Sequence, residues 1–296
     1  MLNPPLSLLS ADLLNYIVDH VANLPSSNLH LDLYNLSITD RAFTRFCQAY
    51  IFKDLYLDYT CETDNSHSIS KKLAKIRNIL NDEPSFANRV RTVHLTVTEA
   101  QNRWLFNDHN FITVFQLLAK SLMPPHRLRL KGDWESFIIE DPILVVGWLM
   151  QSFFSQTLTV LDLTYCENVP LTLFLVCPNL KEVYLDGVGV FESGDDEYPD
   201  EQCSGRELKL PALELLCFRR SKSLVKQMIT PPPKFSTAVV VWSKLRILRL
   251  CPHKKEELMC LQPILDAACN TLEELHLFNG QVDWIRVGNM WSFLSI

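Results

Sequence analysis

The sequence feature that most constrains the fold is a short apolar pattern, L-x-x-L-x-L, which recurs from residue 90 onward. Alternate residues of a strand point to opposite faces, so the leucines of one match turn to the same side. Each match therefore predicts one short strand with a buried face. Clear matches begin at Leu158, Leu180, Leu213, Leu245 and Leu272, and looser ones begin at Val90 and Pro125.

The matches and the segments between them predict an α/β fold. Successive matches begin 22 to 35 residues apart, which is irregular and mostly longer than the ~20–29 residues of a leucine-rich repeat. The segment from Leu158 to Cys166 nevertheless meets the complete leucine-rich pattern. Helix signals lie between the matches, such as Asp141 before Pro142. We expect an irregular leucine-rich-repeat solenoid over 90–296, with a parallel sheet on its concave side. A doubly wound α/β domain is the alternative.

The first ninety residues show helical periodicity in place of the leucine pattern. Ser10 is a candidate cap for an apolar helix over 11–24, and residues 39–52 have the spacing of a helix with one apolar side. The segment 29–38 fits a helix or a strand equally well. A later helix is expected to bury Leu73, Ile76, Ile79 and Leu80. We therefore divide the chain into a helical module (1–60), a connecting helix and loop (61–89) and the repeats (90–296).

The helical module resembles a known family. The family's opening, Leu-Pro-Pro-Glu-Leu-Leu-x-x-Ile-Ile-x-x-Leu, is similar to residues 9–21, with Ser10 in place of the first proline. Its Ser-Leu-Val-Cys-Arg-x-Trp is similar to residues 37–43, where Asp40 replaces the cysteine and Phe43 the tryptophan. A Leu-Phe pair nine residues later corresponds to Ile51 and Phe52. On these motifs, and on the leucine-rich strands that follow, the chain resembles the F-box-like proteins of mushroom-type (basidiomycete) fungi.

The resemblance implies an adaptor role without catalysis. F-box modules dock onto a Skp-type adaptor of an SCF-type cullin–RING ubiquitin ligase, and the following repeats select a protein substrate. The adaptor-binding positions that the resemblance implies are Leu9, Leu13, Leu14, Ile17, Val18, Ile38, Phe43 and Phe52. The same side chains also suit the module's own small core. A leucine-rich-repeat interaction scaffold without coupling to a ubiquitin ligase is the alternative function.

The strand pattern also indicates a surface for the substrate. In each match the third, fifth and seventh positions are expected to face outward from the sheet. The resulting surface carries charges of both signs and aromatic rings, which suits a protein partner better than nucleic acid. Its candidate residues are Asp162, Glu182, Tyr184, Arg219, Arg249, His276 and Phe278.

Other functional classes find little support in the sequence. The net charge of −6 argues against nucleic acid, and the apolar runs are too short for a membrane span. Nine cysteines without a CxxC pair, and an N-terminus without secretory features, predict free thiols in the cytoplasm or nucleus. The spacing of Cys251, His253, Cys260 and Cys269 fits no usual zinc site, and we expect no cofactor. An α/β enzyme whose active site the sequence does not reveal is a third hypothesis.

Three segments interrupt the pattern. Residues 191–207 carry six acidic side chains between Glu192 and Glu201 and are expected to form a solvated loop, or a docking site for a basic partner. Residues 230–238 contain three consecutive prolines and are expected to form a spacer. The apolar end, 284–296, is expected either to fold back as a cap or to mark a sequence that is cut short.

Overall fold

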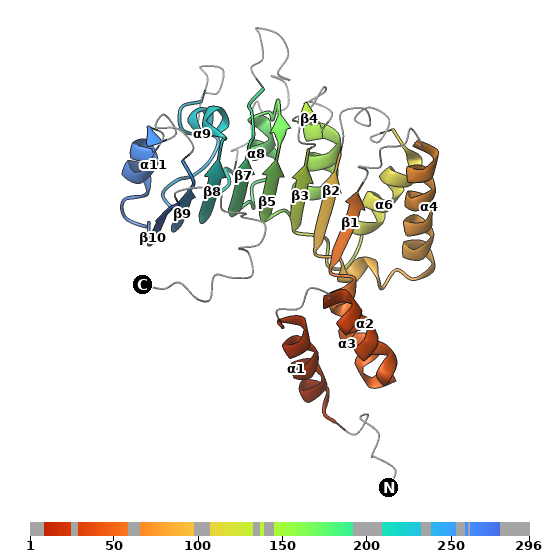
Figure 1. The fold of residues 1–296 in the computed structure, drawn as a ribbon. Coiled ribbons are helices and arrows are strands. Elements are labelled where there is room, and N and C mark those ends of the chain that lie inside the picture. The colour runs from red at the N-terminus through yellow and green to blue at the C-terminus, as the bar shows by residue number, and fades with distance from the viewer. Residues whose placement is uncertain are drawn as a thin grey trace. The chain divides into compact units, whose positions relative to one another are not determined.

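The computed structural model confirms an α/β fold. It describes residues 9–24, 29–58, 66–97, 107–132, 137–138, 145–191, 209–231, 238–252, 258–259 and 261–278. These residues form several helices and an eight-stranded parallel sheet (Figure 1). The acidic segment from Glu192, the prolines at 232–233 and the apolar end from 279 lie outside the described residues. The chain divides into two compact units, residues 1–96 with 103–128, and residues 97–102 with 129–296.

The first unit opens with three helices: α1 (Ala11–Ala22), α2 (Leu29–Thr39) and α3 (Arg41–Ile51). The Ser10 hydroxyl accepts a hydrogen bond from the Leu13 amide at 3.3 Å, which confirms the expected cap of α1. Asp40 caps α3, because its carboxylate accepts from the Ala42 amide at 2.8 Å. The segment that fits a helix or a strand equally well is helical, as α2.

The remainder of the first unit contains β1 (Asp54–Asp58), α4 (Ser66–Asp82), the short 3₁₀ helix η2 (Ala87–Arg89), β2 (Thr92–Thr96) and α6 (His109–Ala119). β1 pairs in parallel with β2, so the sheet begins at Asp54, before the expected start of the repeats at residue 90. α4 packs against α6. Leu73 and Leu80 are buried as expected, whereas Ile79 was assigned to the wrong side of the helix and is 50% exposed.

The other strands and helices belong to the second unit, except that the first two residues of β3 belong to the first. They are β3 (Arg127–Lys131), β4 (Phe137–Ile138), the π-helical segment η4 (Val145–Phe154), β5 (Val160–Thr164), β6 (Cys166–Glu167), α8 (Thr172–Val176), β7 (Glu182–Asp186), β8 (Leu215–Arg219), α9 (Lys222–Ile229), β9 (Ile247–Leu250), α11 (Leu261–Ala268) and β10 (Glu274–Leu277). Each of the seven L-x-x-L-x-L matches supplies one strand of the main sheet, from β2 to β10. β4 and β6 form a separate parallel pair.

The strands of the main sheet lie in chain order. The order is β1-β2-β3-β5-β7-β8-β9-β10. A doubly wound sheet reverses its strand order at a switch point, and the described strands contain no such reversal. The doubly wound alternative is therefore wrong.

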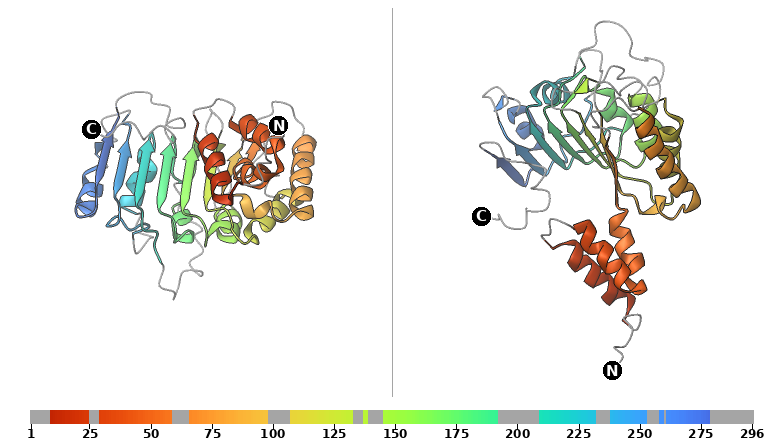
Figure 2. Two further views of the ribbon diagram at one scale, coloured as in Figure 1. Left: turned by 90° about the horizontal axis from the view of Figure 1, so that it is seen from below. Right: turned by 45° about the vertical axis from the view of Figure 1, so that its right-hand side comes forward.

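Helices α8, α9 and α11 cover one face of the second unit's sheet (Figures 1 and 2). The motif leucines from β5 to β9 turn toward that face and are buried, as Leu163 of β5, Leu185 of β7 and Leu250 of β9 illustrate. Burying each such side chain contributes about 1.5–3 kcal/mol to stability. The x positions of the pattern lie on the opposite face of the sheet. The candidate substrate-binding residues belong to that face.

Candidate protein-interaction surfaces

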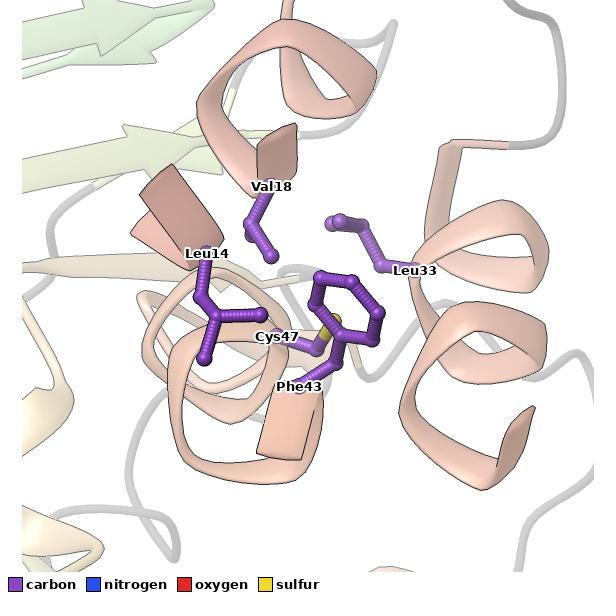
Figure 3. Close-up of a cluster of buried hydrophobic side chains, with 5 residues drawn as sticks. All are labelled: Leu14, Val18, Leu33, Phe43 and Cys47. Atoms are coloured by element: carbon purple, nitrogen blue, oxygen red, sulfur yellow. The ribbon is translucent and has the colours of Figure 1, made fainter. Parts of the chain in front are cut away.

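The three N-terminal helices, here called the head (residues 9–51), have their own apolar core. The side chains that converge in it come from all three helices and are Leu14, Val18, Leu33, Phe43 and Cys47 (Figure 3). The Tyr50 hydroxyl of α3 donates a hydrogen bond to the Asp19 carboxylate of α1 and so ties the two helices together. This bond, together with burial, raises the pKa of Tyr50 to about 12.

The core separates the expected adaptor-binding residues into three groups. Leu14, Val18 and Phe43 are buried inside the head, so they hold the module together and offer no surface to a partner. Leu9 and Ile17 are partly buried against the same core. Phe52 is also partly buried, with its ring centroid 4.4 Å from that of Phe86. Leu13 and Ile38 are exposed.

An exposed apolar row runs along α2. Leu31, Tyr34 and Ile38 are 54%, 56% and 65% exposed, and their spacing of three and four residues places them on one side of the helix. We call these three residues the α2 stripe. On α1, Leu13 and Tyr16 are likewise exposed and three residues apart.

Sequence reasoning missed Leu31, Tyr34 and Tyr16. The available signal was that α2 is apolar on two sides, although a small module needs only one apolar side for its core. Leu33 is buried in the core and Leu36 packs against it, so Leu31, Tyr34 and Ile38 lie outside the core.

The sheet of the second unit aligns the expected substrate-binding residues. Parallel pairing in register places five side chains opposite one another, from β5 to β10: Asp162, Tyr184, Cys217, Arg249 and His276. Glu182 lies in the neighbouring row, opposite Val160 and Leu215. Phe278 follows β10, and its ring stacks on His276 with centroids 6.0 Å apart.

Contacts between strands satisfy much of the charge on this face. Arg129 Nε of β3 donates to the Asp162 carboxylate at 2.6 Å. The Glu274 carboxylate lies 2.8 Å from His276 Nε2 and 3.9 Å from Arg249 Nη2. Within β7, Tyr184 donates to Glu182 at 3.0 Å. The face therefore presents paired charges together with the Tyr184 and His276 rings.

Five positions on this face are buried, although the pattern predicted that they face outward. They are Val160 and Thr164 of β5, Leu215 and Cys217 of β8, and Cys251 after β9. Burial raises the pKa of the Cys217 thiol to about 12, so this thiol is protonated at neutral pH.

A second cluster lies where three successive strands end. Tyr165, Gly187 and Arg220 directly follow β5, β7 and β8, and their φ angles of 54°, 64° and 51° are left-handed. The chain turns in the same way at all three places. The Tyr165 amide donates to the Asp186 carbonyl at 2.8 Å, and the Gly187 amide donates to the Arg219 carbonyl at 2.9 Å.

Two arginines in this cluster share one carboxylate. Arg219 donates to both oxygens of Asp186, through Nε at 2.9 Å and through Nη2. Arg220 donates to Asp186 Oδ1 through Nη2 at 2.8 Å and to the Tyr165 hydroxyl at 3.1 Å. Its guanidinium also lies over the Tyr165 ring, 5.2 Å from the centroid. We call Tyr165, Asp186, Arg219 and Arg220 the arginine-pair cluster.

Of this cluster only Arg219 was a candidate from the sequence. Asp186 also occupies an outward position of its strand, whereas Tyr165 and Arg220 lie just beyond the ends of β5 and β8. The consecutive arginines at 219 and 220 were the available signal. Hydrogen bonding to Asp186 raises the pKa of Arg219 above its ordinary value, so its guanidinium keeps its charge.

The structure also bears on metal binding and on membrane insertion, which the sequence analysis considered. In the described part of the chain, no three His, Cys, Asp or Glu side chains lie close enough together to hold a metal ion. Among the same residues, no helix combines the length and the hydropathy that crossing a bilayer requires. His253 and Cys260 lie outside the described residues.

Comparisons with known proteins add no relative. No family model matches the sequence, and no curated protein is significantly similar to it.

Proposed function

We propose that this protein is a substrate-recognition subunit of an SCF-type cullin–RING ubiquitin ligase. In this proposal the head binds a Skp-type adaptor, and an irregular leucine-rich-repeat solenoid binds a protein substrate. The resemblance of residues 9–52 to F-box-like modules is the starting point, and the exposed residues of the head and of the sheet support it.

The α2 stripe is the observation that carries the proposal. The head already has a core built from all three helices, so Leu31, Tyr34 and Ile38 are not needed to complete it. Three large apolar side chains in a row on one helix, each more than half exposed, are typical of a surface that a partner covers. Leu13 and Tyr16 of α1 add to the apolar surface that the head offers.

The order of the strands supports the repeat part of the proposal. Parallel strands in chain order, each paired in register with the next from β5 to β10, are the arrangement that stacked leucine-rich units produce. Each unit buries its leucines against its neighbours and leaves the x positions on the opposite face. The paired charges and the rings of that face suit a protein substrate.

Co-purification with a Skp-type adaptor tests the proposal. We expect the full chain to retain the adaptor and the Ile38→Asp variant to lose it, because a charge in the α2 stripe would be buried on binding. Ile79→Asp is the matched control. It also places aspartate at an exposed helical isoleucine, but on α4, and so should leave adaptor binding unchanged.

Circular dichroism and thermal melting establish that both variants are folded. Failure of the folded wild-type chain to bind the adaptor would remove the ligase proposal and leave the leucine-rich-repeat scaffold as the function. Equal loss in Ile38→Asp and Ile79→Asp would mean that the α2 stripe is not the docking surface.

A further inference from the structure

Helix α4 of the first unit is fixed to α6 along one side (Figure 1). Leu73 is fully buried on that side. Polar contacts add to the packing, because the Ser70 hydroxyl donates to the Asp108 carboxylate at 2.9 Å and Arg77 Nη1 donates to Asn110 Oδ1 at 2.7 Å. The helix is therefore held in place whether or not anything contacts its other side.

The other side of α4 carries three lysines. Lys71, Lys72 and Lys75 are exposed, and their spacing of three and four residues places them on one side of the helix. We call these three residues the lysine face. In the part of the chain that the structure describes, none of them forms an ion pair or a hydrogen bond through its side chain. Lys71 and Lys75 are like charges four residues apart, an arrangement that destabilises a helix.

Neighbouring side chains of α4 do not balance this charge. The sequence has no acidic residue between positions 66 and 81. The Arg77 guanidinium donates to the side-chain oxygens of Asn78 and Asn110 and, among the described residues, to no carboxylate. The Asp108 carboxylate lies on the packed side, where it accepts from Ser70 and caps α6. The lysine face is thus a positive patch on a chain whose net charge is −6.

We propose that the lysine face binds a short acidic segment of a protein partner. This inference goes beyond the proposed function, because it requires neither the adaptor nor the outward face of the sheet. Charge complementarity defines the occupant, since three ammonium groups within about one and a half helical turns match a run of carboxylates. Ile79 is 50% exposed and lies four residues after Lys75, so it adds an apolar contact on the same side.

The same helix argues against a nucleic acid or a lipid bilayer as the partner. A protein that binds duplex DNA typically makes about 6–10 phosphate contacts, more than the lysine face provides. Asp82 and Glu83 are exposed at the end of α4, where they would repel any extended anionic surface laid along the helix. A short peptide can lie over the lysines without reaching these two carboxylates.

Fluorescence anisotropy with a labelled octaglutamate peptide, added to the full chain without adaptor, tests the proposal. The variant changes Lys71, Lys72 and Lys75 together to glutamine. We expect it to bind about tenfold more weakly, because each exposed lysine–carboxylate pair contributes a factor of about two to five. Glutamine has nearly the helix propensity of lysine, so the variant should keep the circular dichroism spectrum of the wild type.

The matched control removes the same number of charges from the second unit. It changes Lys222, Lys226 and Lys244 together to glutamine and so gives the chain the same net charge as the first variant. We expect its affinity for octaglutamate to stay within about twofold of the wild type, because charges farther than about 8 Å from the peptide are screened at 0.15 M salt.

Two single variants separate this site from the α2 stripe. Ile79→Asp places a negative charge beside the lysine face and should weaken peptide binding several-fold, while adaptor co-purification stays unchanged. Ile38→Asp should have the opposite pattern, with adaptor binding lost and peptide binding kept. Failure of the adaptor test would therefore leave the lysine face standing, and failure of the peptide test would leave the ligase proposal standing.

The remaining outcomes contradict the proposal. Absence of binding by the wild type, equal affinity of the first triple variant, or the same loss in the control would overturn it. Octaglutamine bound as tightly as octaglutamate would show that charge is not recognised. Tighter binding of an oligothymidylate of the same length, or of phosphatidylserine vesicles, would replace the acidic protein by that partner. If the first triple variant unfolds, salt decides: wild-type affinity should fall between about 50 and 300 mM NaCl, and a constant affinity would overturn the proposal.

Discussion

The left-handed positions after β5, β7 and β8 are occupied by a tyrosine, a glycine and an arginine. Only glycine adopts this conformation at low cost. A Cβ on Gly187 would also lie 3.0 Å from Cδ1 of Tyr165. Glycine is therefore favoured after β7 for two reasons. The backbone is left-handed there, and the Tyr165 ring leaves little room for a Cβ.

We expect Gly187→Ala to lower the free energy of unfolding by about 1–3 kcal/mol, measured by chemical denaturation. Gly189→Ala is the comparison. A Cβ there would meet the carboxylate of Glu167, which is the far end of a flexible side chain, and Gly189 has no left-handed φ. A larger loss in Gly189→Ala than in Gly187→Ala would contradict this account.

The thiols of the chain should differ strongly in reactivity. Burial raises the pKa of Cys166, Cys177 and Cys217 to about 12, so almost none of these thiols is ionised at pH 8. Cys269 is exposed. We expect a thiol reagent at pH 8 to label Cys269 in the native protein and to spare the three buried thiols, as read by peptide mass spectrometry. Denaturant should make all four react, and labelling of Cys217 in native protein would show that the sheet face opens.

At the scale of the helix, the bond between Tyr50 and Asp19 joins α3 to α1. We expect Tyr50→Phe to lower stability by about 0.5–1.5 kcal/mol, since Asp19 loses its donor from α3 and keeps only the Asn15 amide of its own helix. The raised pKa of Tyr50 stabilises the folded head below the ordinary tyrosine pKa of about 10, and this contribution is lost as the pH rises toward 12.

Unfolding of the head, followed by circular dichroism between pH 9 and 12, measures this dependence. The wild type should lose stability relative to Tyr50→Phe across that interval. Parallel pH profiles for the two proteins would show that the bond contributes nothing.

The sequence predicted elements well where one side of an element is buried and the other is not. Each of the seven leucine matches forms a strand, because its apolar residues recur with the period of a strand. β1 was assigned to the helical module and not to the sheet, because its apolar run is too short to show the full L-x-x-L-x-L pattern. Ile79 was placed in the core because its helix, α4, has more apolar residues than one buried side accommodates.

The candidate sites were harder to predict than the elements. Apolar spacing identified the residues of the head but did not separate the buried Leu14 from the exposed Leu13, since neighbouring positions on a short helix differ only in what packs against them. The arginine-pair cluster joins Tyr165, Asp186 and Arg220 from the ends of three separate strands. Only the register of the strands brings them together, and a register between distant segments leaves no mark in a single sequence.

At the scale of the whole sheet, stability should depend on the position of each strand. A central strand such as β8 bonds to a strand on each side, whereas among the described strands β10 bonds only to β9. Leu275 and Leu277 of β10 are also exposed, although they occupy leucine positions of the pattern. Neighbour-only contacts make the ends of such an array the least protected part.

Native-state hydrogen exchange should therefore release the amides of β10 before those of β7 and β8. Mass spectrometry of peptides from each strand measures the rates, with peptides from β7 and β8 serving as the internal standard. Exchange of all these strands at one common rate would indicate a single cooperative unit without a weak end.

The in-register pairing of β5, β7, β8 and β9 has one more consequence. The connection from β5 to β7 spans 165–181, whereas those from β7 to β8 and from β8 to β9 span 187–214 and 220–246, yet Val160, Glu182, Leu215 and Ile247 remain opposite one another. Segments outside the strands can thus lengthen or shorten without shifting the alignment. If one strand and its connection were duplicated, the new strand could pair in parallel and in register with the strand on each side of it. The architecture can in this way acquire or discard whole segments during evolution and still keep its outward rows aligned.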